Sequence, residues 1–371
     1  MKMTFEIGRR EFLRQSALAS AAVWLPQLKQ DSPRGEYEIS LGTWPHRIYK
    51  ENDGVLESAS TESFVFNLLV KDNQKNRAVD PLSARLEFYS AGEKVNISEF
   101  SKKALEAIRS VSIATREPDR EDEIFDFRHY FSLPVNLNAE RLVYDLLLMQ
   151  PSNRELHIRL EIPLFRYRQT TKLIFPIKGK FFIGLGHDFN EPHSDGRSQH
   201  FAYDVLGAGP HWEITRNGGA TNADFYSWGR EVIAPADGTV LYSRNDVPDQ
   251  TIPGTINPQL YMNVPNPTLA NPGNHVLLDH GNNEWSSLGH MQHGSVRVKT
   301  GDRVKQGGVL GLTGSAGDSQ LPHLHYQFQM SGEPFYLADG LPSRFENVSF
   351  DLFGKPMKIA TPKRGIPLGA H

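Results

Sequence analysis

The sequence predicts a mostly β protein, with an N-terminal β-sandwich-like module followed by a second β-rich domain. Three observations support this prediction. The 371 residues include 31 glycines and 24 prolines, which suits a chain with many turns. Short runs of alternating apolar and polar residues recur in the first half, and this is the period of half-buried strands. From about residue 181 onward glycine and histidine become frequent, and most of the 14 histidines lie between His187 and His325.

Composition excludes several classes of protein. The chain has no cysteine, which removes disulfide scaffolds, thiolate zinc sites, iron–sulfur clusters and cysteine nucleophiles. A net charge of −3 argues against a nucleic-acid binder that relies on phosphate contacts. With 39% hydrophobic residues the chain can bury real cores, and its length suits two or three domains. A metal in this protein is therefore expected on histidines and carboxylates.

Residues 1–30 have the layout of an export signal. A charged start precedes an apolar run over 17–25, which is too short for a membrane-spanning helix of about 20 residues. The pair Arg9-Arg10, followed by Glu-Phe-Leu, resembles a twin-arginine signal, although Gly8 stands where that class usually has serine or threonine. We expect export to the periplasm or the exterior of a bacterium, with cleavage or retention of the signal left open. The alternative is a basic amphipathic helix of a cytoplasmic protein.

Residues 37–178 are expected to form the sandwich-like module. Alternating runs predict strands over 63–70, 84–89 and 156–162, and several such strands within 140 residues are typical of an antiparallel sandwich. One helix is predicted over 98–109, where apolar residues share a face. No group of residues that could perform catalysis is recognisable here, and the sequence does not indicate the role of this module.

Residues 181–335 are expected to form the second domain, and residues 336–371 a C-terminal extension. Asp-Gly and Gly-Asp turns predict hairpins over 234–241 and 298–311. The stretch 247–274 contains six prolines and cannot be a central strand. A loop of this length in a compact domain is usually functional, for example as a wall or lid of a cleft.

Several chemically active side chains in this domain have spacings that bring them together. His323 and His325 lie two apart on a predicted strand, so both imidazoles face the same side. His200 and Asp204, four apart, can also share a face, and His290 is a further candidate. Two histidines and one carboxylate suit a catalytic zinc site that keeps one position open. Additional imidazoles beside such a site can act as acid or base.

The order of these residues closely resembles that of the lysostaphin-type (LytM-like) zinc endopeptidases, which cut peptides of bacterial peptidoglycan. The resemblance covers about residues 181–335 and implies the duplicated hybrid motif fold of that family. It implies that Asp204 and His325 are zinc ligands, that His323 is the catalytic base and that His290 stabilises the transition state or shuttles a proton. The segments that carry the resemblance, besides these residues, are 229–240, 273–281, 301–304 and 310–319.

The first histidine ligand has two candidates. The common His-x-x-x-Asp spacing of the family selects His200, but Ala202 stands where that pattern usually has glycine. A branch of the family with longer loops has its ligand histidine well upstream, near an asparagine. Asn190 and Gln199 match that branch, and on this alignment His193 is the metal ligand. Both alternatives remain open from the sequence.

The sequence therefore predicts a zinc-dependent endopeptidase that hydrolyses stem or bridge peptides of peptidoglycan. The alternative is a non-catalytic member that binds peptidoglycan or activates another hydrolase. No His-Glu-x-x-His motif occurs, which excludes a thermolysin-type carboxylate base. No nucleic-acid partner is expected, and no membrane span beyond an uncleaved signal. The bond that is cut, D-alanyl–diaminopimelyl or glycyl–glycine, and the oligomeric state do not follow from the sequence.

Overall fold

The chain divides into two compact units in a computed structural model. Described residues up to Arg166 form unit 1, and those from Tyr167 onward form unit 2. The signal predicted over 1–30 lies outside the described residues. The structure describes residues 37–41, 48–52, 61–72, 80–113, 124–150, 152–186, 199, 201–265, 269–333, 338, 340–353 and 355–371.

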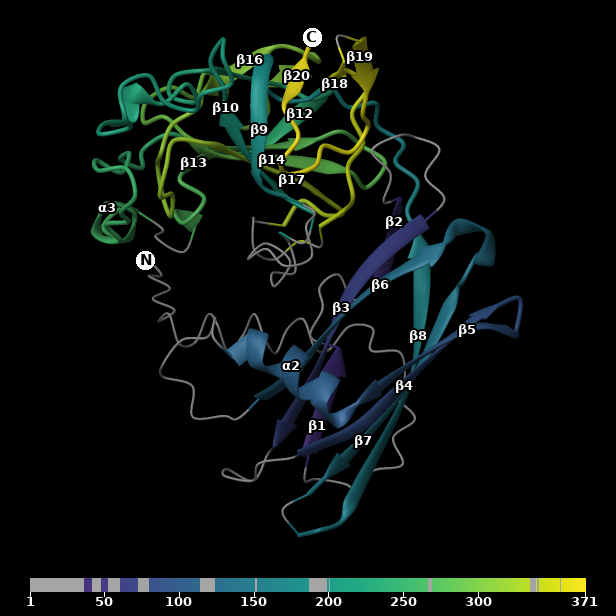
Figure 1. The fold of residues 1–371 in the computed structure, drawn as a ribbon. Coiled ribbons are helices and arrows are strands. Elements are labelled where there is room, and N and C mark those ends of the chain that lie inside the picture. Colours follow the sequence, from purple (N-terminus) through teal and green to yellow (C-terminus); the bar gives the residue numbers. More distant parts are fainter. Residues whose placement is uncertain are drawn as a thin grey trace, which may run out of the picture. The chain divides into compact units, whose positions relative to one another are not determined.

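Unit 1 consists of strands with one longer helix (Figure 1). Its strands are β1 (Tyr37–Leu41), β2 (Ile48–Asn52), β3 (Thr61–Asp72), β4 (Asp80–Ser90), β5 (Glu93–Ser101), β6 (Ile124–Pro134), β7 (Arg141–Met149) and β8 (Glu155–Arg166). Its helices are α2 (Lys102–Ile113) and the short 3₁₀ turn η1 (Val135–Leu137). Strand order is β1-β3-β2-β8-β7-β4-β5, with β6 on β3. The described strand pairs of this unit are antiparallel except β2 with β8. Because strands make up most of the unit, the predicted mostly β class is confirmed.

The helix of unit 1 begins later than the sequence predicts. Residues Ser98 to Ser101 pair with β4 as the end of β5, because their alternation continues that of the strand. The side chain of Ser101 then accepts the N–H of Ala104 at 3.4 Å, as expected of a residue at a helix start.

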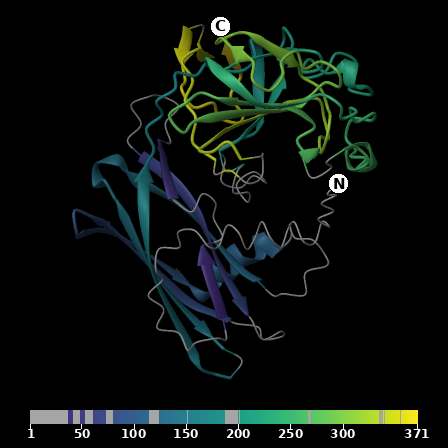
Figure 2. The ribbon, with the colours of Figure 1, turned by 180° about the vertical axis from the view of Figure 1, so that it is seen from behind.

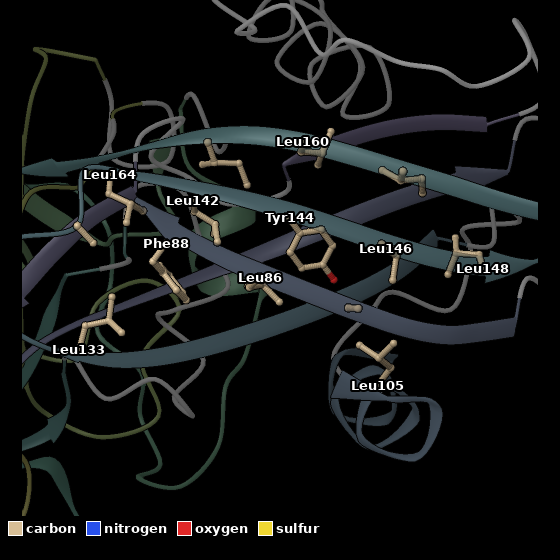
Figure 3. Packing of buried hydrophobic residues seen from close by; sticks show 14 of the residues in the cluster. Leu86, Phe88, Leu105, Leu133, Leu142, Tyr144, Leu146, Leu148, Leu160 and Leu164 are labelled. Carbon is tan, nitrogen blue, oxygen red and sulfur yellow. The ribbon is translucent and has the colours of Figure 1, made fainter. Parts of the chain in front are cut away.

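The core of unit 1 lies on one face of β4, β7 and β8 (Figure 3). Every second residue of β8 is buried, from Leu156 to Leu164, as the alternation of the sequence requires. Leu105 of α2 and Leu133 of β6 pack into the same cluster. Fully buried Tyr144 lies in the middle of the cluster, labelled in Figure 3. The core therefore joins sheet, helix and β6 into one unit.

Unit 2 is also built mainly of strands (Figure 2). Its strands are β9 (Gly179–Leu185), β10 (Tyr203–Gly207), β11 (Glu231–Ile233), β12 (Gly238–Arg244), β13 (Asn274–Asp279), β14 (Trp285–Met291), β15 (Arg303–Val304), β16 (Val309–Leu312), β17 (Leu324–Gln329), β18 (Val348–Leu352), β19 (Lys355–Lys358) and β20 (Leu368–Ala370). Two short helical segments are η3 (Asn222–Asp224) and α3 (Gln259–Met262).

Ten of these strands form one antiparallel sheet in the order β15-β12-β13-β14-β17-β10-β9-β20-β18-β19, and β11 pairs with β16. The two predicted hairpins, 234–241 and 298–311, are wrong. β11 and β12 do not pair with each other: β11 pairs with β16 and β12 with β15. The two turns lie where the sequence places them. The strands before and after the first turn, β11 and β12, pair with the strands after and before the second turn, β16 and β15.

The start of unit 2 is tied to the β13–β14 turn by a buried carboxylate. Glu284, 2% exposed, accepts the N–H groups of Thr170 and Thr171, both at 2.7 Å, and the hydroxyl of Tyr167. Burial raises the pKa of Glu284, but these donors outweigh it and hold the pKa below its ordinary value. Within the described residues, no helix is long and apolar enough to cross a bilayer.

Candidate metal and catalytic centre

The register of β10 and β17 places Asp204 beside His325. Tyr203 precedes Asp204 in β10, and Tyr326 follows His325 in β17. The two tyrosines lie opposite each other and are fully buried. Both contact the ring of Phe345 edge-on. Because successive side chains of a strand alternate between faces, the polar pair lies on the other face. A slip of one residue would drive the carboxylate into the aromatic core, so the tyrosines fix the register of the site.

Three side chains converge at the start of β17. Oδ1 of Asp204 lies 3.0 Å from Nδ1 of His325 and 3.3 Å from Nε2 of His323. The ring of His323 is oriented by Nδ1, which donates to the carbonyl of Leu321 at 2.7 Å. The two histidines are 2% and 9% exposed. Both imidazoles of the His-Leu-His sequence thus reach one carboxylate.

His290 of β14 completes the cluster. Its ring centroid lies 4.6 Å from that of His323 and 5.9 Å from that of His325. Its Nδ1 donates to the carbonyl of Ala316 at 2.7 Å. The backbone of His290 has φ of 56°, in the left-handed region that residues other than glycine rarely adopt. Such strain persists only where surrounding contacts hold it, and it gathers at functional sites.

The pKa values of His290 and His323 are shifted in opposite directions. Burial, together with the neighbouring imidazoles, lowers the pKa of His290 well below its ordinary value. Burial also lowers the pKa of His323, but the charge and contact of Asp204 outweigh it, so this pKa is raised. Since Nδ1 of His290 carries the proton, its Nε2 presents a lone pair to the site at neutral pH. The site therefore combines a neutral imidazole with one that readily holds a proton.

The proline-rich stretch supplies a support that the sequence did not reveal. Residues 247–250, which we call the strap, cross beside the loops that follow β14 and β16. Oδ1 of Asp249 accepts the N–H of Ser315 at 2.7 Å, and Oδ2 accepts that of His293 at 2.9 Å. Burial raises the pKa of Asp249, and the two N–H groups lower it in part. One carboxylate thus holds both loops that flank His290.

The strap is bonded further to the loop that carries Ala316. The backbone N–H of Gln250 donates to the carbonyl of Ser315 at 2.9 Å, and its side chain donates to the carbonyl of Gly317 at 2.6 Å. Gly317 has φ of 81°, and a Cβ placed there would lie 2.3 Å from the carbonyl oxygen of Asn271. Only glycine allows this approach of two backbones. The acceptor of the His290 proton is therefore fixed from both sides.

The described residues contain two of the three zinc ligands that the family resemblance implies. His193 and His200, the candidates for the third, lie outside the described residues. The described part of the chain holds no complete group of three metal-ligating side chains. The donors that are present fit zinc, because a carboxylate oxygen and the imidazole nitrogen of His325 meet at 3.0 Å with Nε2 of His323 beside them.

Two further histidines of unit 2, His275 and His280, are held by structural bonds. His280 bridges the carbonyl of Asp237 and the hydroxyl of Ser286, both at 2.8 Å. His275 bonds the carbonyl of Gly273 at 2.9 Å. The residues that sequence reasoning missed are Asp249 and Gln250, and Ser319, whose hydroxyl lies 3.2 Å from Nδ1 of His323. Proline density marked the stretch that contains the strap, but no pattern marked its side chains.

Residues 218–336 match the model of a known protein family, described as peptidase family M23. Over this segment, about a third of the chain, the protein is similar to the M23 peptidases. The matched region contains His290, His323 and His325, and it begins after Asp204.

Two curated relatives are peptidoglycan DD-endopeptidases of Vibrio cholerae. ShyC is 43% identical over 60 residues, and ShyA is 37% identical over 62 residues. The aligned residues make up 16% and 17% of this chain but only 13% and 14% of the relatives. The chain therefore spans about one seventh of the length of these two proteins.

Solved structures of low identity are also similar. The catalytic domain of lysostaphin from Staphylococcus simulans matches at 19% identity with a TM-score of 0.23, over 46% of this chain and 88% of that one. A zinc-containing peptidase from Vibrio cholerae matches at 13% identity with a TM-score of 0.24, over 87% and 90%.

Proposed function

We propose that the protein is a zinc-dependent endopeptidase that hydrolyses peptide cross-links of bacterial peptidoglycan. The observation that carries this proposal is the meeting of His323 and His325 on the carboxylate of Asp204, with the ring of His290 beside them. The rings of His290 and His323 are each held by a backbone carbonyl. The left-handed backbone of His290 is the kind of strain that gathers at functional sites. The M23 family and the DD-endopeptidase relatives support the choice of substrate.

Asp204, His325 and either His193 or His200 would hold the metal. When bound, zinc supplies a Lewis acid that polarises the scissile carbonyl and makes a water acidic near neutral pH. His323 is oriented to take the proton of the attacking water at Nε2 and to hold it beside Asp204. The same proton would then pass from Nε2 to the leaving amine as the peptide bond breaks.

His290 suits a proton shuttle that then supports the developing negative charge. Its Nδ1 stays bonded to the carbonyl of Ala316, so Nε2 is the atom that exchanges a proton with the site. A protonated Nε2 donates a hydrogen bond to an oxyanion, and this raises turnover without contributing to metal affinity. His290→Ala should therefore lower turnover while bound zinc stays near one per chain.

The test of the proposal is mass spectrometry of the muropeptides released from purified sacculi by the zinc-loaded protein, with His323→Ala as the matched inactive variant. New uncross-linked peptides from the parent protein alone support the proposal. A second candidate is a non-catalytic member that binds peptidoglycan. Sedimentation of the zinc-loaded parent with sacculi, without release of any peptide, would favour that role and refute hydrolysis.

An envelope location follows from the same proposal, since the substrate lies outside the cytoplasm. The basis in the sequence is the Arg9-Arg10 pair, which suits export in the folded state. Replacing both arginines with lysine should leave the protein in the cytoplasm of a fractionated cell. Unchanged export of that variant would remove the twin-arginine assignment.

A further inference from the structure

A cavity of about 220 Å³ lies over β12, β13 and β14 of unit 2. Its walls include Leu241, Leu269 and Leu277, and the ring of Tyr242 stacks on that of His275 at 5.0 Å between centroids. An apolar cavity of about 150 Å³ already accepts benzene. This cavity therefore has room for a side chain as large as leucine or phenylalanine.

Strand register places the cavity on the same face of the sheet as the histidine cluster. Leu277 lies opposite Ser287 on β14, and Gly289 lies opposite His325 on β17. Residues two apart on one strand share a face, so Ser287 and His325 point the same way. Two residues along β14 and one strand across amount to about 8 Å between their Cα atoms. An extended peptide covers that distance in two or three residues.

The lining carries polar groups but no charge. Ser287, 2% exposed, and His275, 5% exposed, are the polar side chains that line the cavity besides Tyr242. Nδ1 of His275 donates to the carbonyl of Gly273, so Nε2 is the atom with a lone pair. Burial lowers the pKa of His275 to about 4, so the ring is neutral at pH 7. An ammonium or carboxylate group would lose its hydration here without meeting an opposite charge.

We infer that this cavity is a specificity pocket for an uncharged, apolar side chain of the substrate peptide, two or three residues from the bond that is cut. The inference rests on the proposed function and sharpens its substrate class. A glycine bridge leaves the pocket empty, and the charged side chain of diaminopimelate or lysine is excluded from it. An alanine methyl enters it and larger aliphatic groups fill it, so the pocket favours cross-links with alanine at that position over polyglycine bridges.

The experiment uses the zinc-loaded full chain and defined quenched-fluorescence peptides. Glycine, alanine, leucine, lysine and aspartate are placed in turn at the second and third positions on each side of the scissile bond. At one of these positions kcat/KM should rise about fourfold from glycine to alanine and at least tenfold from glycine to leucine, the scale of burying apolar carbons. Lysine and aspartate at that position should fall below glycine.

A charge at the mouth of the pocket should reverse this preference. Leu241 is 42% exposed at the rim, so Leu241→Asp is expected to leave the fold intact. It should raise kcat/KM for the lysine peptide and lower it for the leucine peptide. Ile252→Asp, at a residue 61% exposed that does not line the cavity, is the matched control and should change kcat/KM for neither peptide.

The outcomes separate this inference from the proposed function. Cleavage of sacculi or peptides without an apolar preference at any tested position would overturn the pocket and leave the peptidase intact. Equal changes in Leu241→Asp and Ile252→Asp would also overturn it. If the zinc-loaded protein hydrolysed neither sacculi nor any peptide, the proposed function would fall, and the assignment of substrate would fall with it.

Discussion

Replacing Asp249 with asparagine should separate turnover from metal binding. The carboxylate accepts one N–H on each oxygen, from Ser315 and from His293. Asparagine keeps one acceptor oxygen and turns an NH₂ group toward the other N–H. One of the two loops beside His290 is then released from the strap, while the proposed zinc ligands Asp204 and His325 keep their contact with each other.

The magnitude follows from the bonds that are lost. A hydrogen bond to a charged group contributes about 1.5–3 kcal/mol, so Asp249→Asn should lower the free energy of unfolding by about 2 kcal/mol. The larger effect is expected on catalysis, because one of these loops directly follows His290 in the chain and the other carries the carbonyl of Ala316 that orients its ring. A displacement of about 1 Å in a catalytic group costs on the order of 100-fold in rate. We expect kcat to fall between tenfold and 100-fold.

The assay measures kcat and KM on one peptide, bound zinc after dialysis, and unfolding in urea. Asp237→Asn is the matched control, because Asp237 likewise accepts a backbone N–H, from Gln306 at 2.8 Å, and bonds Lys305 at 2.7 Å. The bonds of its carboxylate go to the turn between β15 and β16, so Asp237→Asn should lose stability but not kcat. The reasoning is refuted if Asp249→Asn keeps the kcat of the parent, or if its loss of activity is matched by loss of zinc.

Three further outcomes are expected. Folding lowers the pKa of His275 from about 6.5 to about 4, so the unfolded state binds a proton first as the pH falls. The free energy of unfolding should therefore drop between pH 6.5 and 4 by up to about 3 kcal/mol. In urea unfolding, His275→Gln should lack this part of the decrease. His323→Ala should keep about one zinc per chain while turnover falls on the order of 100-fold; loss of zinc would mean that the two histidines of the pair are exchanged. Of His193→Ala and His200→Ala, one should lose most of its zinc on dialysis and the other keep it; full retention by both would place the metal elsewhere.

Local alternation was sufficient to predict many of the strands and to place His323 and His325 on the same side, whereas their meeting with Asp204 was implied by the family resemblance. The run 156–162 lies within β8, and its buried positions are those that the period of two requires. The side chains of His323 and His325 lie on the same side because residues two apart on a strand share a face. Such features are predictable because they are decided by neighbours in the sequence.

Partner choice and loop contacts are decided by residues far apart, and here the sequence was insufficient. The strands around both predicted hairpins carried clear turn signals, yet β11 and β12 pair across to β16 and β15. Asp249 binds backbone groups 44 and 66 residues away, and a lone aspartate among prolines gives no indication of them. Residues 98–101 were predicted as helix but form the end of β5, because strand pairing outweighed helix propensity there.

The buried carboxylate of Glu284 determines where unit 2 can be separated from the rest of the chain. The sequence places a domain boundary at about residue 181, where glycine and histidine become frequent. A fragment that begins there lacks the three residues that donate to Glu284. It also lacks the buried Phe175, whose ring stacks on that of Phe181 at 4.2 Å. The fragment then loses three hydrogen bonds to a charged group and exposes the ring of Phe181, which destabilises it by several kcal/mol. A recombinant fragment or a natural processing cut that leaves an active, soluble enzyme is therefore expected to retain Tyr167.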